Sequence, residues 1–164
     1  MRIVLASASP RRRELLEQAG IDFEILIGST RECITKEEPG EIVEELSLAK
    51  ALGVAEAVTG DAVIIWADTI VAKGNRVLGK PKDAEDAHQM LAMLQGEKHQ
   101  VYTGVTLLQK KGDEKIIRSF HERTDVFMTS MSDQEIEAYI ATGEPFDKAG
   151  SYGIQGRAGI FVER

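Results

Sequence analysis

The 164-residue chain has one cysteine, Cys33, so it forms no intramolecular disulfide and cannot build a thiolate metal site. A single thiol suits the reducing cytosol. Long apolar runs are also absent, since no stretch approaches the about 18 residues that span a bilayer. The N-terminus offers only four consecutive apolar residues, 3–6, which are too few for a signal peptide. We therefore expect a cytoplasmic protein with no membrane partner.

Positive charge is in deficit, because 20 lysines and arginines face 27 aspartates and glutamates, which gives a formal net charge of -7. This balance disfavours non-specific binding to nucleic acid or anionic lipid. We expect no nucleic-acid partner, although DNA binding through a local arginine cluster is an alternative. A basic cluster in an acidic chain instead indicates a discrete anionic ligand.

Several nucleotide and hydrolase motifs are missing as well. The chain has no P-loop, no glycine-rich dinucleotide fingerprint after a strand and no nucleophile elbow. These absences exclude a P-loop ATPase, a Rossmann dehydrogenase and an α/β-hydrolase. His88, His99 and His121 have no spacing typical of a metal triad, and we interpret them as surface or strand residues.

Apolar runs and helical periodicities alternate along the chain, with hairpins between them. This order predicts an α/β fold, a mixed and twisted central sheet flanked by helices, with a hairpin-rich second lobe. We expect residues 1–164 to form one domain with two lobes around a central cleft. The expected strands are 3–6, 23–27, 62–67, two pieces within 70–77, 99–109, 115–129 and 158–162, and the expected helices are 10–19, 41–59, 83–95 and 132–142.

The most informative block is Ser7–Arg13, which lies on a strand-to-helix turn. Ser9 is a good N-cap and Pro10 fits the first helical position. Three arginines then fall beside the positive end of the helix dipole, which is unfavourable unless an anion binds there. The block therefore indicates a phosphate site, or else a solvated basic helix start.

Asp68 follows the continuous apolar run 62–67, so we expect it at the carboxyl end of a buried strand, near the Ser7–Arg13 turn. Its carboxylate can hold a magnesium ion, and Glu32 in a polar loop can supply a second oxygen ligand. Lys80 lies on a rigid turn between Gly79 and Pro81, where it suits a phosphate contact. The alternatives are a turn-forming aspartate and a solvated lysine.

A further block, 147–156, combines an acid, a lysine, a tyrosine, a glutamine and three glycines. Such a loop lets the backbone approach a ligand closely while an amide reads a nucleobase edge. The alternative is a glycine-rich connector.

Taken together, these blocks resemble the Maf family of nucleoside triphosphate pyrophosphatases. The resemblance runs nearly end to end, through Leu5–Arg12 with Glu14–Leu16, Ala67–Val71, Gly79–Pro81, Thr103–Val105, and Gly143–Pro145 leading into Asp147–Gly156. It implies a house-cleaning enzyme that cleaves between the α- and β-phosphates and releases a nucleoside monophosphate and pyrophosphate with Mg²⁺, or with another divalent cation such as Mn²⁺. The opening block and the 147–156 block look like the branch that acts on dTTP, UTP and modified pyrimidine nucleotides.

The resemblance also assigns roles to single residues. Ser7 or Ser9, with Arg11 and Arg12, would hold the phosphates. Asp68 would bind metal and act as the base for the attacking water, and a homodimer is implied. The other implied roles are metal binding by Glu32, charge neutralisation by Lys50 and Lys80, base reading by Gln155, and substrate binding by Thr69 and Lys148. The competing hypothesis is a non-catalytic nucleotide-binding regulator linked to septum formation and cell-division arrest.

Overall fold

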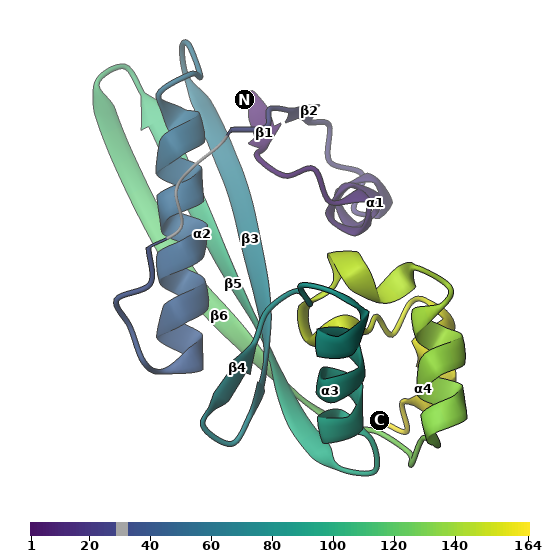
Figure 1. Ribbon diagram of the computed structural model, residues 1–164. Coiled ribbons are helices and arrows are strands. Elements are labelled where there is room, and N and C mark those ends of the chain that lie inside the picture. Colours follow the sequence, from purple (N-terminus) through teal and green to yellow (C-terminus); the bar gives the residue numbers. More distant parts are fainter. Residues whose placement is uncertain (29–32) are drawn as a thin grey trace. The chain divides into compact units, whose positions relative to one another are not determined.

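The computed structural model describes residues 1–28 and 33–164 (Figure 1). The chain divides into two compact units, which we treat separately. Unit 1 comprises Met1–Asp68 with Thr103–Glu122, and unit 2 comprises Thr69–Tyr102 with Arg123–Arg164. Among the described residues, no helix has the length and apolar character needed to cross a membrane.

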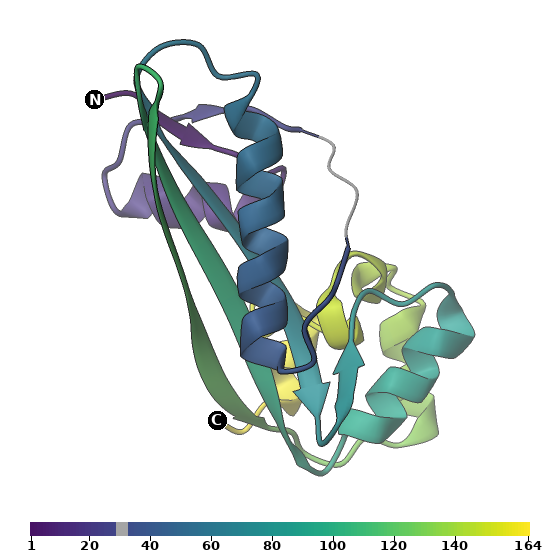
Figure 2. The same cartoon turned by 90° about the vertical axis from the view of Figure 1, so that its left-hand side faces the viewer.

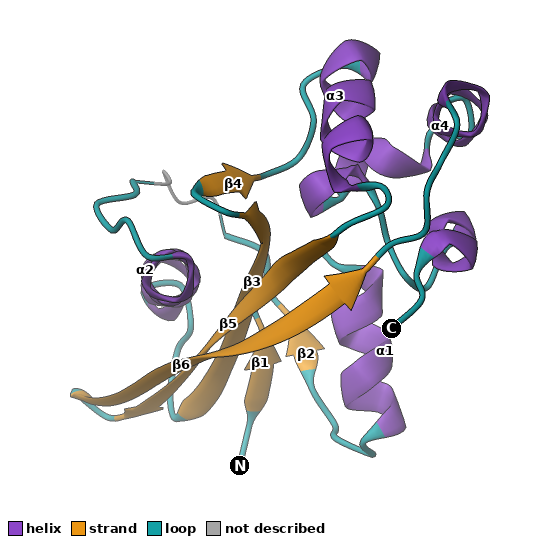
Figure 3. Ribbon diagram, turned by 90° about the horizontal axis from the view of Figure 1, so that it is seen from below, coloured by secondary structure: helices purple, strands orange, loops and turns teal. Residues whose placement is uncertain are grey.

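The strands form one mixed sheet with the strand order β2-β1-β3-β5-β6, and β4 pairs with β3 (Figure 3). Strand β1 lies parallel to both β2 and β3, whereas β4 runs antiparallel to β3. The predicted mixed sheet with flanking helices is therefore confirmed. The strands are β1 Ile3–Leu5, β2 Glu24–Ile25, β3 Ala62–Lys73, β4 Arg76–Leu78, β5 Lys98–Lys111 and β6 Glu114–Phe127.

In unit 1, helix α1 (Pro10–Gln18) connects β1 to β2, and helix α2 (Pro39–Ala55) covers one face of the strands (Figures 1 and 2). Apolar residues of α2 and of the strands share one core, and each large side chain buried there contributes about 1.5–3 kcal/mol. This packing holds α2 in place along the strands. The buried core residues are Val4, Ala6, Ala51, Val54, Ala55, Val58, Ala62, Ile64, Trp66 and Leu108.

In unit 2, helix α3 (Ala84–Leu94) packs against helix α4 (Asp133–Ile140) and the short helix η2 (Ala149–Ser151). Asp83 caps α3 by accepting the Asp86 N–H at 2.8 Å. The capping box predicted from Ser132 and Glu135 is present at the start of α4. The core residues of this unit are Val71, Leu78, Met90, Leu91, Leu94, Val126, Met128, Met131, Ile136, Tyr139, Tyr152 and Ala158.

The strand predicted over 158–162 is wrong. The chain instead forms a 3₁₀ helix, η3 (Arg157–Phe161), and only Val162 makes an isolated bridge, to Met128. The reason is local, because the Gly159 N–H bonds back to Gly156 O at 3.1 Å and turns the chain. An ideal Cβ on Gly159 would lie 2.6 Å from Ile154 O, so the turn depends on glycine. The strand predicted over 23–27 also shortens, to the two residues of β2.

His99 is a strand residue, as expected, but its side chain is fully buried in β5. Burial, with a smaller effect from the charge of Lys73, lowers the pKa of the imidazole to about 4. An unfolded histidine titrates near 6.5. The unfolded chain therefore binds one more proton than the native protein between these values, so His99 destabilises the fold as the pH falls through this window.

We expect acidification from neutral pH to about pH 4.5 to cost roughly 2 kcal/mol of stability through His99 alone. Urea unfolding of the wild type and of His99→Gln at both pH values measures this contribution, because the glutamine cannot titrate. The wild type should lose more stability on acidification than the variant. Equal losses in the two proteins would contradict the assignment.

Candidate active site

The turn that leads into α1 is organised around the hydroxyl of Ser7. Ser7 is 3% exposed, and its Oγ accepts the Ser9 N–H at 3.3 Å and an N–H of Arg12 Nη1 at 3.0 Å. Ser9 takes the N-cap position as expected, and Pro10 follows in the first turn of the helix. The side chain of Ser9 makes no capping hydrogen bond. The first turn of α1 contains no acidic residue. Ser7 therefore orders this turn, whereas the hydroxyl of Ser9 does not cap the helix.

Arg12 carries a guanidinium in an unfavourable place for a cation. Burial lowers its pKa below the usual value, Arg11 lowers the pKa further, and the negative charge of Asp68 opposes both effects. Arginine stays protonated in proteins, so the charge persists. The positive end of the α1 dipole lies beside it. This corner of unit 1 therefore favours an additional anion.

Asp68 lies inside the twelve-residue strand β3, so its predicted position at a strand end is wrong. The strand continues because Ile70 and Val71 after it are buried. A carboxylate is accommodated there because Lys50 Nζ, from α2, forms an ion pair with Asp68 Oδ2. The two side chains are 17% and 19% exposed, so they are only partly screened by solvent.

Trp66, which precedes Asp68 by two residues, also contacts Lys50. Its ring is buried, and Lys50 Nζ lies 5.6 Å from the ring centroid, within the range of a cation–π interaction. No local pattern in the sequence connects these two residues. Trp66 supports the ammonium group from the core side, while Asp68 neutralises it.

A magnesium ion is compatible with the donors present. Mg²⁺ binds through one or two carboxylates together with substrate phosphates and water, and needs no preformed protein cage. Asp68 supplies one carboxylate in the partly buried cluster with Lys50. Within residues 1–28 and 33–164, no group of three or more potential metal ligands is gathered. Glu32, the predicted second ligand, lies outside the described residues.

Two predicted binding residues of unit 2, Lys80 and Lys148, lie on two connected loops. The Gly150 N–H donates to Gly79 O at 2.9 Å, which joins the turn that carries Lys80 to the loop that follows Lys148. Lys80 is exposed. Lys148 Nζ donates to Glu144 O at 2.8 Å and to Asp147 Oδ1 at 2.6 Å.

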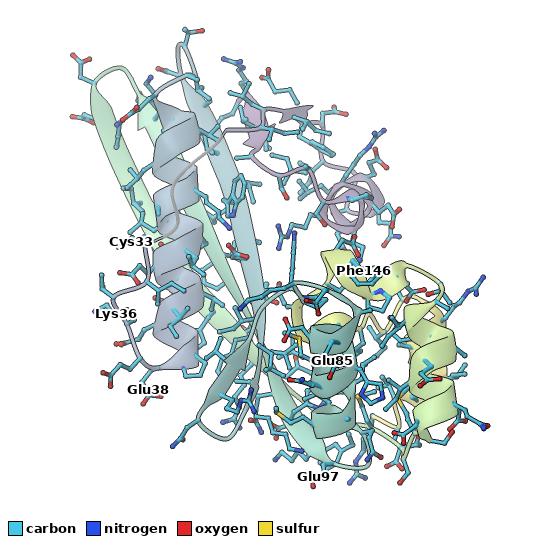
Figure 4. All side chains as sticks on the ribbon, viewed as in Figure 1. Cys33, Lys36, Glu38, Glu85, Glu97 and Phe146 are labelled. Atoms are coloured by element: carbon cyan, nitrogen blue, oxygen red, sulfur yellow. The ribbon has the colours of Figure 1, made fainter. Side chains whose placement is uncertain are left out.

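Thr69 is half-buried in β3 and Gln155 is exposed. Two labelled side chains lie outside these groups: Cys33 is exposed in the segment before α2, and Phe146 is exposed in η1 (Glu144–Asp147) (Figure 4). The predicted roles of Thr69, Lys80, Lys148 and Gln155 stay predictions.

Glu144 is a residue that the sequence analysis missed. Its carboxylate accepts the Tyr139 hydroxyl at 2.9 Å and the Arg157 N–H at 3.1 Å. An ideal Cβ on Gly156 would lie 2.0 Å from Glu144 Oε1, so a larger residue there would displace the Glu144 carboxylate. Gly156 was a signal for a close approach, but nothing in the sequence identified the partner. Glu144 thus fixes the turn that contains Gln155.

A sequence model described as a Maf-like protein matches residues 2–164. The chain belongs to the Maf family. A dTTP/UTP pyrophosphatase of Agathobacter rectalis is 49% identical over 174 residues, covering 98% of this chain and 85% of its own. A dTTP/UTP pyrophosphatase of Bacillus cytotoxicus is also 49% identical, over 99% of this chain and 83% of its own. The solved structure of a HAM1 protein from Coxiella burnetii is 16% identical, with a TM-score of 0.49 over 94% of this chain and 88% of that one.

Within this Maf-family chain, the structure gathers four of the predicted residues in unit 1. Ser7 bonds Arg12, Arg12 interacts electrostatically with Asp68, and Asp68 pairs with Lys50. Arg11 follows Pro10 in the same turn. The cluster combines partly buried cations, one carboxylate and a helix N-terminus, which is a set of groups suited to phosphoryl transfer.

Proposed function

We propose that this chain hydrolyses dTTP, UTP and modified pyrimidine nucleoside triphosphates to the monophosphate and pyrophosphate. The curated relatives at 49% identity carry the name dTTP/UTP pyrophosphatase and match the chain over nearly its whole length. The observation that carries the proposal is the cluster of Ser7, Arg12, Lys50 and Asp68 in unit 1. Its cationic side chains can bind a triphosphate, and its carboxylate can activate a water molecule beside them.

The α1 turn binds the phosphates in this proposal. Free N–H groups of the first helical turn and the α1 dipole attract anionic oxygen atoms. The guanidinium of Arg12, which donates to Ser7 Oγ, presents further N–H groups to the phosphate oxygen atoms. The guanidinium of Arg11 presents a second set of N–H donors. These groups bind the substrate and also stabilise the charge that develops on the leaving pyrophosphate.

Asp68 orients the attacking water and accepts its proton. The water oxygen forms a bond to the α-phosphorus, and the bond from that phosphorus to the bridging oxygen breaks with its electron pair on pyrophosphate. Lys50 keeps the Asp68 carboxylate in place and neutralises charge close to the reaction. Lys80, Lys148 and Gln155 of unit 2 keep their predicted roles in phosphate and base binding.

We further propose that Asp68 and Glu32 hold Mg²⁺, or another divalent cation such as Mn²⁺, with oxygen atoms of the substrate. The hard oxygen donor of Asp68 suits such an ion. When bound, the cation neutralises phosphate charge and makes a bound water more acidic. We also propose a homodimer in the cytoplasm, which the family resemblance supports.

A nucleotide panel tests the proposed activity. Purified protein with MgCl₂ is incubated with dTTP, UTP, CTP, ATP and GTP, and pyrophosphate is measured with and without EDTA. We expect pyrophosphate from dTTP and UTP above all, and its loss with EDTA. Nucleotide binding without pyrophosphate release from any pyrimidine triphosphate would favour the non-catalytic regulator instead.

A further inference from the structure

The loop after Lys148 contains a strained and buried turn. Gly150 and Ser151 both have positive φ, 66° and 64°, and Ser151 is the one non-glycine residue with positive φ in the described parts of the chain. Both residues are buried, and Ser151 Oγ lies 3.2 Å from Met90 Sδ. L-residues rarely keep this conformation unless the surroundings enforce it, and such strain gathers at functional sites.

A buried polar pair lies directly after this turn. Tyr152 Oη and His99 Nε2 are 2.7 Å apart, and the rings meet edge to face with centroids 5.4 Å apart. His99 is fully buried and Tyr152 is 8% exposed. His99 Nδ1 has no hydrogen-bond partner among the described residues. Two apolar side chains would fill the same space without this desolvation, so the pair needs an explanation beyond packing.

The Gly150–Ser151 turn, directly before Tyr152, is connected to two lysines. Lys148 precedes Gly150 by two residues, and the Ser151 N–H donates to Lys148 O at 3.1 Å. The Gly150 N–H holds Gly79 O, next to Lys80. Gly150 also packs tightly on β3, because an ideal Cβ there would lie 2.7 Å from Val71 Cγ2. A shift at Tyr152 would therefore reach both lysine-bearing segments of unit 2.

We propose that His99 and Tyr152 are positioning residues whose hydrogen bond holds the Gly150–Ser151 turn, and thereby Lys148 and Lys80, in the arrangement that binds the triphosphate. The inference rests on the proposed function, which assigns phosphate contacts to these lysines. His99 suits this task because its neutral ring stays buried in β5, and its Nε2 is the atom that holds the Tyr152 hydroxyl.

The first test is Tyr152→Phe, which removes only the hydroxyl and keeps the ring in the core. We expect kcat/KM for UTP to fall roughly 10- to 100-fold, mainly through a higher KM, because displaced lysines bind the phosphates less well. The matched control is Thr106→Val, which removes a fully buried hydroxyl that bonds Ser47 in unit 1. An unchanged KM in Tyr152→Phe, or an equal rise in Thr106→Val, would overturn the proposal.

A second test does not depend on activity. Amide hydrogen exchange at Gly150 should be at least about tenfold faster in Tyr152→Phe, while the amides of α3 keep their protection. His99→Leu should reproduce this change, and His99→Gln should partly restore protection because its amide can pair with the hydroxyl. Unchanged Gly150 exchange overturns the inference, whereas absence of pyrophosphate release by the wild type overturns only the proposed function.

Discussion

Asp68→Asn should lower the rate of pyrophosphate release from UTP by about a thousandfold, the contribution expected of a general base. Asparagine has nearly the same size as aspartate but cannot accept the proton of the attacking water. It also leaves the ammonium of Lys50 and the guanidinium of Arg12 without their shared anion. The measurement is the initial rate of pyrophosphate formation, with circular dichroism to show that the variant is folded.

The same substitution should cost about 1–2 kcal/mol of stability, because the Lys50–Asp68 pair is only partly exposed. Asp61→Asn is the matched control, since Asp61 is an exposed carboxylate of unit 1 that accepts the Gly112 N–H at 2.9 Å. An asparagine can accept the same bond, so this variant should keep its activity and stability. Wild-type rates in Asp68→Asn would rule out the assigned role.

Local signals in the sequence were sufficient for much of the fold. The spacing of Ser132 and Glu135 alone predicts the start of α4. The turn residue Gly112 likewise predicts the hairpin of the long strands β5 and β6. These features depend on residues close in sequence, where propensity and periodicity act. The α1 turn was found in the same way, through Ser9 and Pro10.

Other features depend on contacts that no local pattern encodes. His99 and Tyr152 are 53 positions apart, and neither spacing nor composition connects them. A polar residue such as Asp68 after an apolar run predicts the end of a strand, yet its pairing with Lys50 lets β3 continue through it. Sequence reasoning thus named the charged residues of the candidate site but missed the groups that position them.

Gly104→Ala should be the most destabilising glycine substitution in unit 1. An ideal Cβ at Gly104 in β5 would lie 2.3 Å from Val43 O and 2.4 Å from Val43 C, which belong to the main chain of α2. Because backbone cannot rotate away, α2 must move. We expect a loss of about 3 kcal/mol, or about 6–12 °C in Tm for a chain of this size. Thermal unfolding measures the effect.

The contrast with Gly40→Ala makes this test specific. An ideal Cβ at Gly40 would lie 2.4 Å from His121 Nε2, which is part of a side chain that can turn aside. Alanine in a helix also gains up to about 1 kcal/mol over glycine, so the net change should stay within about 1 kcal/mol. Since α2 carries Lys50, Gly104→Ala should also lower activity by displacing the ammonium from Asp68. We propose that the close approach of β5 to α2 at Gly104 sets the position of Lys50. Similar Tm values for the two variants would contradict this role.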